Sequence, residues 1–221
     1  MEIISLENAQ KIYKCKKHNV TALNRISLTV QSGEFLAVTG ASGSGKTTLM
    51  NVIGFLDSLT KGEYRFLGES TSGLSEGKKH RLRAENVGFV FQNFNLISSL
   101  SALHNVMLPL LYRGVPRSKS KAAALDALKR VGLCDRAGHL PCRLSGGQQQ
   151  RVAIARAIVS SPALILADEP TGNLDPDTSE EIMDLLCSLH QKGHTVVMIT
   201  HNLTLAQKAD RVIKMNDGKM V

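Results

Sequence analysis

Three short runs of consecutive apolar residues mark the chain, at residues 35–38 (FLAV), 163–167 (ALILA) and 195–199 (TVVMI). A strand covered by helices on both faces is apolar at nearly every position, whereas a strand with one wet face alternates. The three runs therefore predict buried strands of a parallel sheet in an α/β fold.

Between the last two runs the apolar residues follow a helical period. The stripe consists of Ile182, Leu185, Leu186 and Leu189. Pro176 precedes it and Gly193 follows it, as at the start and end of a helix. The order strand, helix, strand predicts a βαβ unit.

The middle of the chain has a different pattern. From about residue 101 to 144 there is no comparable apolar run, and apolar residues recur three apart from 122 to 131. The segment PLLYRGVPRSKSK adds a Gly/Pro break with positive charge. This pattern predicts a helical lobe inserted into the α/β core.

A glycine-rich loop follows the first apolar run. Its sequence, GASGSGKTT, comprises Gly40, Ala41, Ser42, Gly43, Ser44, Gly45, Lys46, Thr47 and Thr48. The spacing fits GxxxxGK[ST], whose backbone N–H groups surround phosphates at the mouth of a helix. Lys46 would reach the outer phosphates and the Thr47 hydroxyl would bind Mg²⁺. The alternative, a Gly/Ser turn that binds nothing, is disfavoured by the strand before the loop and the helix after it.

Two acids follow the second apolar run. Asp168 and Glu169 can serve one site only if the chain turns there, and Pro170 is consistent with that turn. Ligands of parallel sheets bind at such carboxyl ends. Asp168 is expected to hold Mg²⁺, and Glu169 to orient the attacking water or accept its proton. The alternative is a surface turn.

A second glycine pair occurs in LSGGQQQRVAIARAI. Ser145 can cap a helix, and Gly146 and Gly147 leave its first N–H groups uncovered. Buried positions at Val152, Ala155, Ala157 and Ile158 would follow. A simple capped helix is the alternative to a second phosphate-binding helix mouth.

Composition limits the class of protein. The 221 residues are 43% hydrophobic, and no apolar run approaches the roughly 18 residues of a membrane span. The first six residues are followed by charge rather than by a signal-peptide core. We therefore expect a cytosolic chain.

The net charge of +8 raises the question of polyanion binding. Basic clusters occur at KIYKCKKH, GKKHRLR and YRGVPRSKSK, but aromatic residues make up only 4% of the chain. Because few aromatics lie among the clusters to stack on bases, solvated basic faces are favoured over specific nucleic-acid binding.

Cysteine and histidine spacing gives little sign of a metal centre. Cys15, Cys134, Cys142 and Cys187 show no CxxC spacing, which favours reduced, mostly structural thiols. His190 and His194 lie four apart, but Gly193 between them predicts a surface turn rather than a metal pair.

Three motifs in order carry a family resemblance: the phosphate loop, LSGGQQQR and LILADEPTGNLD. With them, essentially the whole chain resembles the ATP-binding subunit of an ABC transporter. The resemblance implies a P-loop α/β core of ABC ATPase type with an inserted helical subdomain and an antiparallel β lobe. One domain would span 1–221, with a RecA-like core at about 1–92 and 160–221 and the helical subdomain at about 93–159.

The resemblance also assigns roles. Tyr13 matches the aromatic that stacks on adenine, and Gln92 the glutamine that joins Mg²⁺ and the attacking water to the helical subdomain. His201 matches the histidine that contacts the γ-phosphate, and Asp175 the aspartate of the loop that crosses between subunits. Without the family, Tyr13 would be a core residue, Gln92 a strand end and His201 a helix cap.

Grouped by role, the expected site has three parts. The catalytic residues are Glu169, His201 and Gln92, and the metal ligands are Thr47, Gln92 and Asp168. The signature residues that would contact ATP in the other subunit are Leu144, Ser145, Gly146, Gly147 and Gln148. The implied cofactors are ATP and Mg²⁺.

The segments 90–115 and 145–175 are similar to one branch of the family, which contains macrolide exporters (MacB), lipoprotein-release systems (LolD), peptide-resistance pumps and the cell-division ATPase FtsE. This implies an ATPase at the cytoplasmic face of the membrane that dimerises on ATP and powers a separate permease for a peptide, lipid, lipoprotein or drug. An accessory protein outside the membrane is a further implied partner. Mechanical signalling without transport is the alternative, and a DNA- or ribosome-directed ATPase is disfavoured because no second nucleotide domain or coiled coil is evident.

Overall fold

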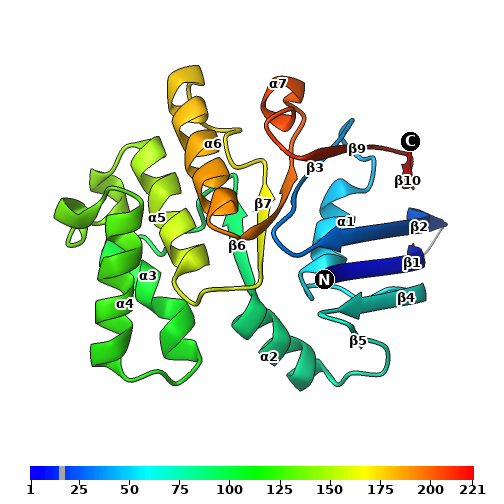
Figure 1. Ribbon diagram of the computed structural model, residues 1–221, viewed down its shortest axis with the longest axis horizontal. Helices are drawn as coiled ribbons and strands as arrows, with labels where there is room; N and C mark the ends of the chain where they lie inside the picture. The colour runs from blue at the N-terminus through cyan, green and yellow to red at the C-terminus, as the bar shows by residue number, and fades with distance from the viewer. Residues whose placement is uncertain (15–17) are drawn as a thin grey trace.

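A six-stranded sheet forms the centre of the molecule, with helices beside it and a smaller sheet at one end (Figure 1). The computed structural model describes residues 1–14 and 18–221, so Cys15 lies outside the described residues. The strands are β1 (Glu2–Lys14), β2 (Asn19–Gln31), β3 (Phe35–Gly40), β4 (Lys61–Phe66), β5 (Glu69–Ser70), β6 (Val87–Phe91), β7 (Leu164–Asp168), β8 (Thr195–Ile199), β9 (Arg211–Asn216) and β10 (Lys219–Met220). The helices are α1 (Lys46–Ile53), α2 (Glu76–Asn86), α3 (Ala102–Tyr112), α4 (Arg117–Arg130), α5 (Gly146–Ile158), α6 (Pro176–Gln191) and α7 (Leu203–Ala206), with short 3-10 turns at Cys134–Arg136 and Pro141–Arg143.

The central sheet has the order β10-β9-β3-β8-β7-β6, and its strands run parallel from β9 to β6. The three apolar runs form β3, β7 and β8, which confirms the predicted buried strands. In the register, Phe91 lies opposite Asp168, and Asp168 lies opposite Ile199. The residues that follow these strands therefore meet at one edge of the sheet.

The smaller sheet is antiparallel, with the order β2-β1-β4-β5, and lies at the right in Figure 1. It confirms the expected antiparallel β lobe. Helix α1 joins the two sheets, since its buried Leu49 and Met50 share one hydrophobic core with Leu6 of β1 and Val38 of β3. The phosphate loop before α1 is thereby fixed between two rigid layers.

Helices α3, α4 and α5 lie together at the left in Figure 1, between β6 and β7 in the chain. They confirm the predicted helical lobe. Val106, Leu128 and Ile154, one from each helix, are fully buried in a core that continues to Ile165 of the sheet. The division at residues 93 and 159 stays a prediction.

The stripe in α6 is confirmed, because Ile182, Leu186 and Leu189 are buried. The turn expected between His190 and His194 is confirmed, because α6 ends before Gly193. The helix continues to Gln191, and the His190 ring packs 5.8 Å from the Phe35 ring. The chain then turns at Lys192 and Gly193, where Gly193 has φ 92°.

The thiols are free at Cys134, Cys142 and Cys187, as expected. The interpretation of mostly structural thiols is wrong for Cys134 and Cys142, which are exposed because both lie in the short 3-10 turns at the surface. Within residues 1–14 and 18–221, His, Cys, Asp and Glu form no group of three that could hold a metal ion.

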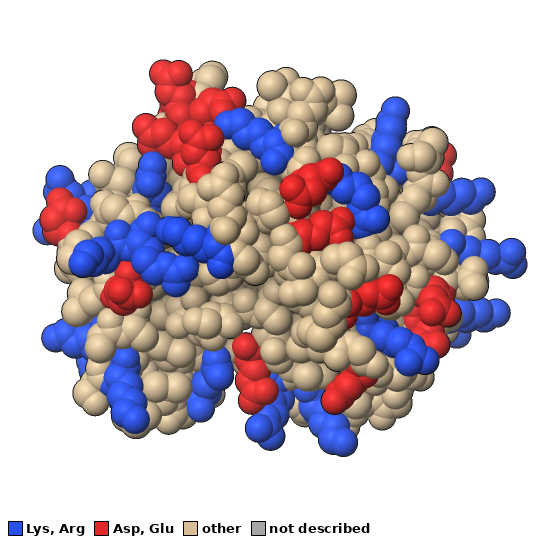
Figure 2. All heavy atoms as spheres, in the orientation of Figure 1, with Lys and Arg blue, Asp and Glu red and all other residues tan. Residues whose placement is uncertain are grey.

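Charged residues are interspersed over the face seen in Figure 2. Acidic side chains gather over α6, where Glu180 and Asp184 both pair with Lys208. No single basic stripe crosses this face. In the part of the chain that the structure describes, none of the helices has the length and apolar character to cross a membrane.

Candidate nucleotide-binding site

A cavity of about 680 Å³ opens at the carboxyl edge of the central sheet. Predicted site residues from four loops line it: the phosphate loop, the end of β6, the end of β7 and the segment after β8. These residues are Gly40, Ser42, Gly43, Gly45, Lys46, Thr47, Thr48, Gln92, Asp168, Glu169 and His201. The parallel register explains why segments more than 100 residues apart in sequence meet here.

Two glycines of the phosphate loop are required by close contacts. Gly40 has φ 149°, and a Cβ there would lie 2.2 Å from the Met215 carbonyl oxygen. Gly45 has φ 100°, and its Cβ would lie 2.4 Å from the Ala22 carbonyl oxygen. Any larger residue would displace the loop from β2 and β9.

Helix α1 begins at Lys46 without a side-chain cap, because its N-cap residue is Gly45. Its first N–H groups therefore remain available to an anion. Lys46 is only 8% exposed, and its Nζ donates to the carbonyl oxygens of Gly40 (2.8 Å) and Ala41 (2.7 Å). These bonds hold the ammonium group at the wall of the cavity.

Two loop residues do not line the cavity. Ala41 offers its carbonyl to Lys46, and Ser44 is 3% exposed. The Ser44 carbonyl accepts a hydrogen bond from the N–H of Gly218 at 3.0 Å. Both residues therefore support the conformation of the loop through main-chain hydrogen bonds.

Asp168 ends β7, and the chain turns at Glu169, which has φ 44°. The Glu169 N–H donates to the Ile199 carbonyl at 2.9 Å. This turn brings both carboxylates to the cavity and rules out a surface turn unconnected with the site. Burial raises the pKa of Asp168, the charge of Glu169 raises it further, and Lys46 opposes the shift.

His201 contacts Glu169 directly. Its Nδ1 lies 2.9 Å from Glu169 Oε1, with the imidazole 73% and the carboxylate side chain 16% exposed. His201 is not a helix cap, since α7 is capped by Asn202. The pair joins the segments after β7 and β8.

Gln92 follows β6, and its amide is held by Asn173. Gln92 Nε2 donates to Asn173 Oδ1 at 3.0 Å, and Asn173 Nδ2 donates to the Gln92 carbonyl at 3.2 Å. Sequence reasoning missed Asn173, although it lies in LILADEPTGNLD. In the sequence, Asn173 is marked by a short amide side chain that follows Asp168 and Glu169 closely.

Thr47, Gln92 and Asp168 supply a hydroxyl, an amide and a carboxylate oxygen to the same cavity. Mg²⁺ prefers oxygen ligands and is commonly bound by one or two protein carboxylates together with phosphates and waters. The donor set therefore fits Mg²⁺.

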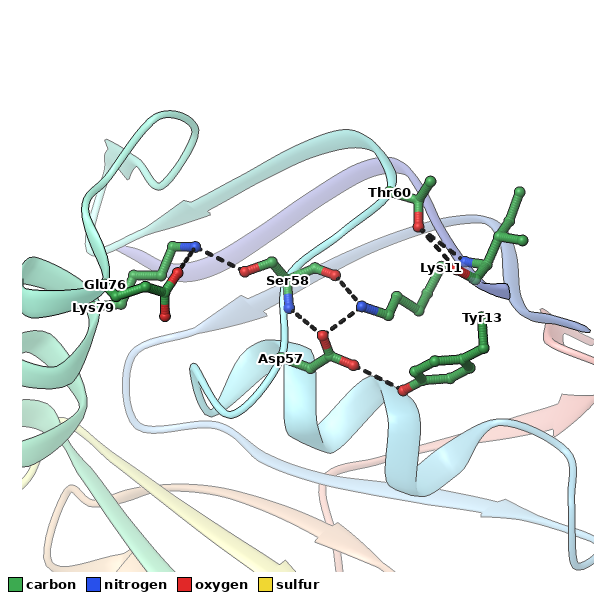
Figure 3. Close-up of polar contacts among 8 residues, drawn as sticks. Lys11, Tyr13, Asp57, Ser58, Thr60, Glu76 and Lys79 are labelled. Atoms are coloured by element: carbon green, nitrogen blue, oxygen red, sulfur yellow. Dashed lines mark hydrogen bonds and ion pairs between the residues drawn. The ribbon is translucent and has the colours of Figure 1, made fainter. Parts of the chain in front are cut away.

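Tyr13 lies outside the cavity lining, at the end of β1, and is 37% exposed, so it is not a core residue. Figure 3 shows its hydroxyl pointing at Asp57, with an oxygen–oxygen distance of 2.8 Å. Lys11 Nζ bonds the same carboxylate and lies 5.0 Å from the Tyr13 ring centroid. The ring is thus held in place.

The contacts around Tyr13 shift the pKa values of Asp57 and Tyr13 in opposite directions. Burial raises the pKa of Asp57, but bonds from Lys11, Tyr13 and the Ser58 N–H outweigh it and lower the pKa below its usual range. Burial and the Asp57 carboxylate raise the pKa of Tyr13, so its hydroxyl stays protonated as the donor.

The signature residues Leu144–Gln148 lie away from this cavity. Ser145 caps α5 by accepting from the Gln148 N–H, and the Gln148 side chain bonds back to the Ser145 N–H. The predicted cap is confirmed, as is burial of Val152, Ala155, Ala157 and Ile158. Asp175 is also outside the cavity, where its carboxylate caps α6 through the Thr178 N–H at 3.0 Å.

Six residues of the cavity were missed by sequence reasoning: Val20, Thr21, Ala22, Ile199, Asp217 and Gly218. The first three belong to β2, and the last two form the turn between β9 and β10. The Asp-Gly dipeptide is a hairpin signal, but nothing local relates it to the phosphate loop.

A second, larger groove of about 1060 Å³ lies between α2, β6 and the helices α3 and α5. Its floor includes Phe89 and Phe91, whose rings stack at 5.5 Å. Arg83, Arg113 and Arg156 contribute to its wall. It combines apolar surface with mainly basic side chains and one carboxylate, Glu85, which pairs with Arg81.

Comparison with known proteins agrees with this geometry. The family model described as ABC transporter matches residues 23–172. The chain is 49% identical over 99% of its length to the uncharacterized ABC transporter ATP-binding protein YvrO of Bacillus subtilis, covering 96% of that protein. It is 48% identical over 99% of its length to the macrolide export ATP-binding/permease protein MacB of Chlorobaculum tepidum, but spans only 34% of that relative.

Two solved structures of the cassette MJ0796 superpose with a TM-score of 0.89. They are 43% and 44% identical to the chain and cover 98% of it and 96% of their own chains. Both are dimeric, and one is a post-hydrolysis state bound to ADP and Pi. The family match over most of the chain, together with this cavity, shows that the chain belongs to the ABC transporter ATP-binding family and is an ABC ATPase.

Proposed function

We propose that the chain hydrolyses ATP with Mg²⁺ to power a separate membrane permease. The observation that carries the proposal is the meeting of Lys46, Asp168, Glu169, Gln92 and His201 in one cavity. An ammonium group, two carboxylates, an amide and an imidazole beside an uncapped helix N-terminus suit phosphoryl transfer to water.

Each of these cavity residues has a proposed role in ATP binding or hydrolysis. Lys46 Nζ and the N–H groups at the start of α1 bind the phosphates. Thr47, Gln92 and Asp168 hold Mg²⁺, which neutralises phosphate charge when bound. Glu169 orients the attacking water and accepts its proton. His201 contacts the γ-phosphate, and its Nδ1 is hydrogen-bonded to Glu169.

The proposed site needs a second copy of the chain. The N-terminus of α5 and Asp175 both lie outside the cavity of their own chain. In a head-to-tail dimer, residues Leu144–Gln148 of one copy would close over ATP held by the other, and Asp175 would lie in the crossing loop. The dimeric relatives support this arrangement.

The groove of about 1060 Å³ is the surface proposed for the permease. Its stacked Phe89 and Phe91 offer apolar area, and its arginines offer donors to an acidic or polar helix end. Bound there, the chain would lie peripherally at the cytoplasmic face of the membrane.

The name of the macrolide exporter MacB supports export of a drug-like substrate. Export or extraction of a peptide, lipid or lipoprotein belongs to the same proposal. The alternative is mechanical signalling across the membrane without cargo, which would use the same site. An accessory protein outside the membrane belongs to the same proposal. Identification of the co-purifying membrane protein distinguishes these functions.

The test is an ATPase assay of the purified wild-type chain, alone and with its permease. Phosphate release that requires Mg²⁺ and stops with EDTA is expected. Absence of Mg²⁺-dependent hydrolysis in both preparations would contradict the proposal.

Tyr13 provides a prediction for the adenine side. Tyr13→Ala should weaken ATP binding about 10-fold, because stacking of a base on an aromatic ring contributes roughly 1–3 kcal/mol. Tyr13→Phe keeps the ring and should bind ATP nearly as well as wild type. Equilibrium titration with a fluorescent ATP analogue measures both, and equal affinity of the alanine variant and wild type would exclude stacking at Tyr13.

A further inference from the structure

Gln150 is a fully buried amide in the second turn of α5, with 0% exposure. Its Nε2 donates to the main-chain carbonyl of Pro170 at 2.6 Å. Its Oε1 is buried and accepts no hydrogen bond from the residues that the structure describes. The side chain therefore makes one strong contact and leaves one polar atom unsatisfied.

Such an amide contributes little to stability. A hydrogen bond gives a net stabilisation of roughly 0.5–1.5 kcal/mol, whereas a buried acceptor without a partner costs roughly 1–3 kcal/mol. An apolar side chain of the same length would remove the unpaired acceptor, and it would leave the Pro170 carbonyl without its donor. The contact with Pro170 thus suggests a function other than stability.

The Pro170 carbonyl belongs to the turn that carries Glu169. Glu169 has a left-handed backbone, φ 44°, which is uncommon outside glycine. Its N–H donates to Ile199, and its carbonyl accepts from the Gly172 N–H at 3.0 Å. The hydrogen bond from Gln150 to Pro170 is a third restraint on this turn, and it comes from helix α5.

Helix α5 also carries the signature residues at its N-terminus, one turn before Gln150. Gly147 of that turn packs against α6, where a Cβ would lie 2.4 Å from Thr178 Cγ2. The helix end proposed to meet the partner's nucleotide is thereby connected, through one amide, to the turn that positions Glu169 at the chain's own nucleotide.

We infer that Gln150 is a positioning residue for ATP hydrolysis, because its hydrogen bond to Pro170 fixes the Glu169 carboxylate relative to α5. This inference rests on the proposed role of Glu169. Gln150 is not among the residues that line the cavity, so it acts through the turn. A shift of α5 when the dimer closes would move Glu169 with it.

The test is Gln150→Met, which keeps the side-chain length and removes the donor. We expect kcat for ATP to fall about 10-fold, less than the roughly 100-fold that a 1 Å misplacement can cost. ATP affinity should be unchanged, because Lys46 and α1 are untouched. Tm should be close to that of wild type, because the variant removes the unpaired Oε1 but leaves the Pro170 carbonyl without its donor. Ser120→Ala is the control, since it removes a buried hydroxyl whose acceptors are the Val115 and Pro116 carbonyls, and it should leave kcat unchanged.

Two results would overturn the inference: wild-type kcat in folded Gln150→Met, whatever its Tm, or weakened ATP binding that accounts for the lost rate. Gln150→Leu is measured in parallel, and failure of both variants to fold would show that the amide is structural. A wild-type chain without ATPase activity would instead contradict the proposed function, so the two failures are distinguishable.

Discussion

Glu169→Gln is expected to lower kcat for ATP hydrolysis by about 10²- to 10⁴-fold, the usual contribution of a positioned base. Glutamine keeps the shape of the side chain but cannot accept the proton of the attacking water. ATP binding should persist, because the phosphate loop and Lys46 are unchanged. Phosphate release and equilibrium ATP titration, measured on the same preparation, test the two parts.

The same variant should accumulate as an ATP-bound dimer. Hydrolysis is the step that would separate the two copies, so blocking it leaves the nucleotide to hold them together. Gel filtration at saturating ATP should show the dimer for Glu169→Gln. Glu181→Gln is the matched control, because Glu181 pairs with Arg151 at the surface. This variant should hydrolyse ATP as wild type does.

Retention of wild-type kcat in Glu169→Gln would show that another group is the base. His201 would be the next candidate by position, since it lies 2.9 Å from the same carboxylate. A monomer at saturating ATP would argue against the head-to-tail dimer even if kcat fell as expected.

Lys46→Ala is expected to weaken ATP binding about 10- to 100-fold. A hydrogen bond to a charged group contributes roughly 1.5–3 kcal/mol, and 1.4 kcal/mol corresponds to a factor of ten in affinity. The ammonium group is held by the Gly40 and Ala41 carbonyls at the cavity wall, so its position is fixed before the nucleotide arrives. Isothermal titration with ATP in EDTA measures the change without hydrolysis.

Lys192→Ala is the control for Lys46→Ala, because Lys192 is exposed beyond the end of α6. Unchanged ATP affinity in Lys46→Ala would mean that the lysine serves the loop structure alone. In that case the variant should lose thermal stability, since the two carbonyl oxygens would lose their donor.

Much of the fold follows from short-range patterns. The runs that became β3, β7 and β8 are apolar throughout because both faces of a parallel sheet are covered, and the stripe of α6 has an unbroken helical period. The phosphate loop is equally local, since Gly40 and Gly45 take backbone angles that other residues avoid. The antiparallel lobe was predicted only from the family resemblance. Strand β2 carries a local signal that sequence reasoning missed, because its buried Ile26, Leu28 and Val30 alternate with exposed residues. The pairing of β1 with β2 is irregular.

The missed parts depend on long-range contacts. Thr21 and Gly218 reach the cavity only because β2 and the β9–β10 turn meet beside the phosphate loop, where the Asn24 N–H donates to the Gly218 carbonyl at 2.8 Å. Asn173 and Asp57 bond residues 81 and 44 positions away. A single sequence carries no signal for such pairs. The contact of the His190 ring with Phe35 is of the same kind, because the two residues are far apart in the chain.

The most direct test of the account is the structure of Glu169→Gln saturated with ATP and Mg²⁺, by crystallography or cryo-EM. We expect two copies related head to tail, with the Ser145 hydroxyl and the Gly147 N–H of each within hydrogen-bonding distance of the γ-phosphate bound at the other copy's Lys46. A nucleotide enclosed by residues of one copy alone, with the start of α5 exposed to solvent, would contradict the claim that two chains share each ATP.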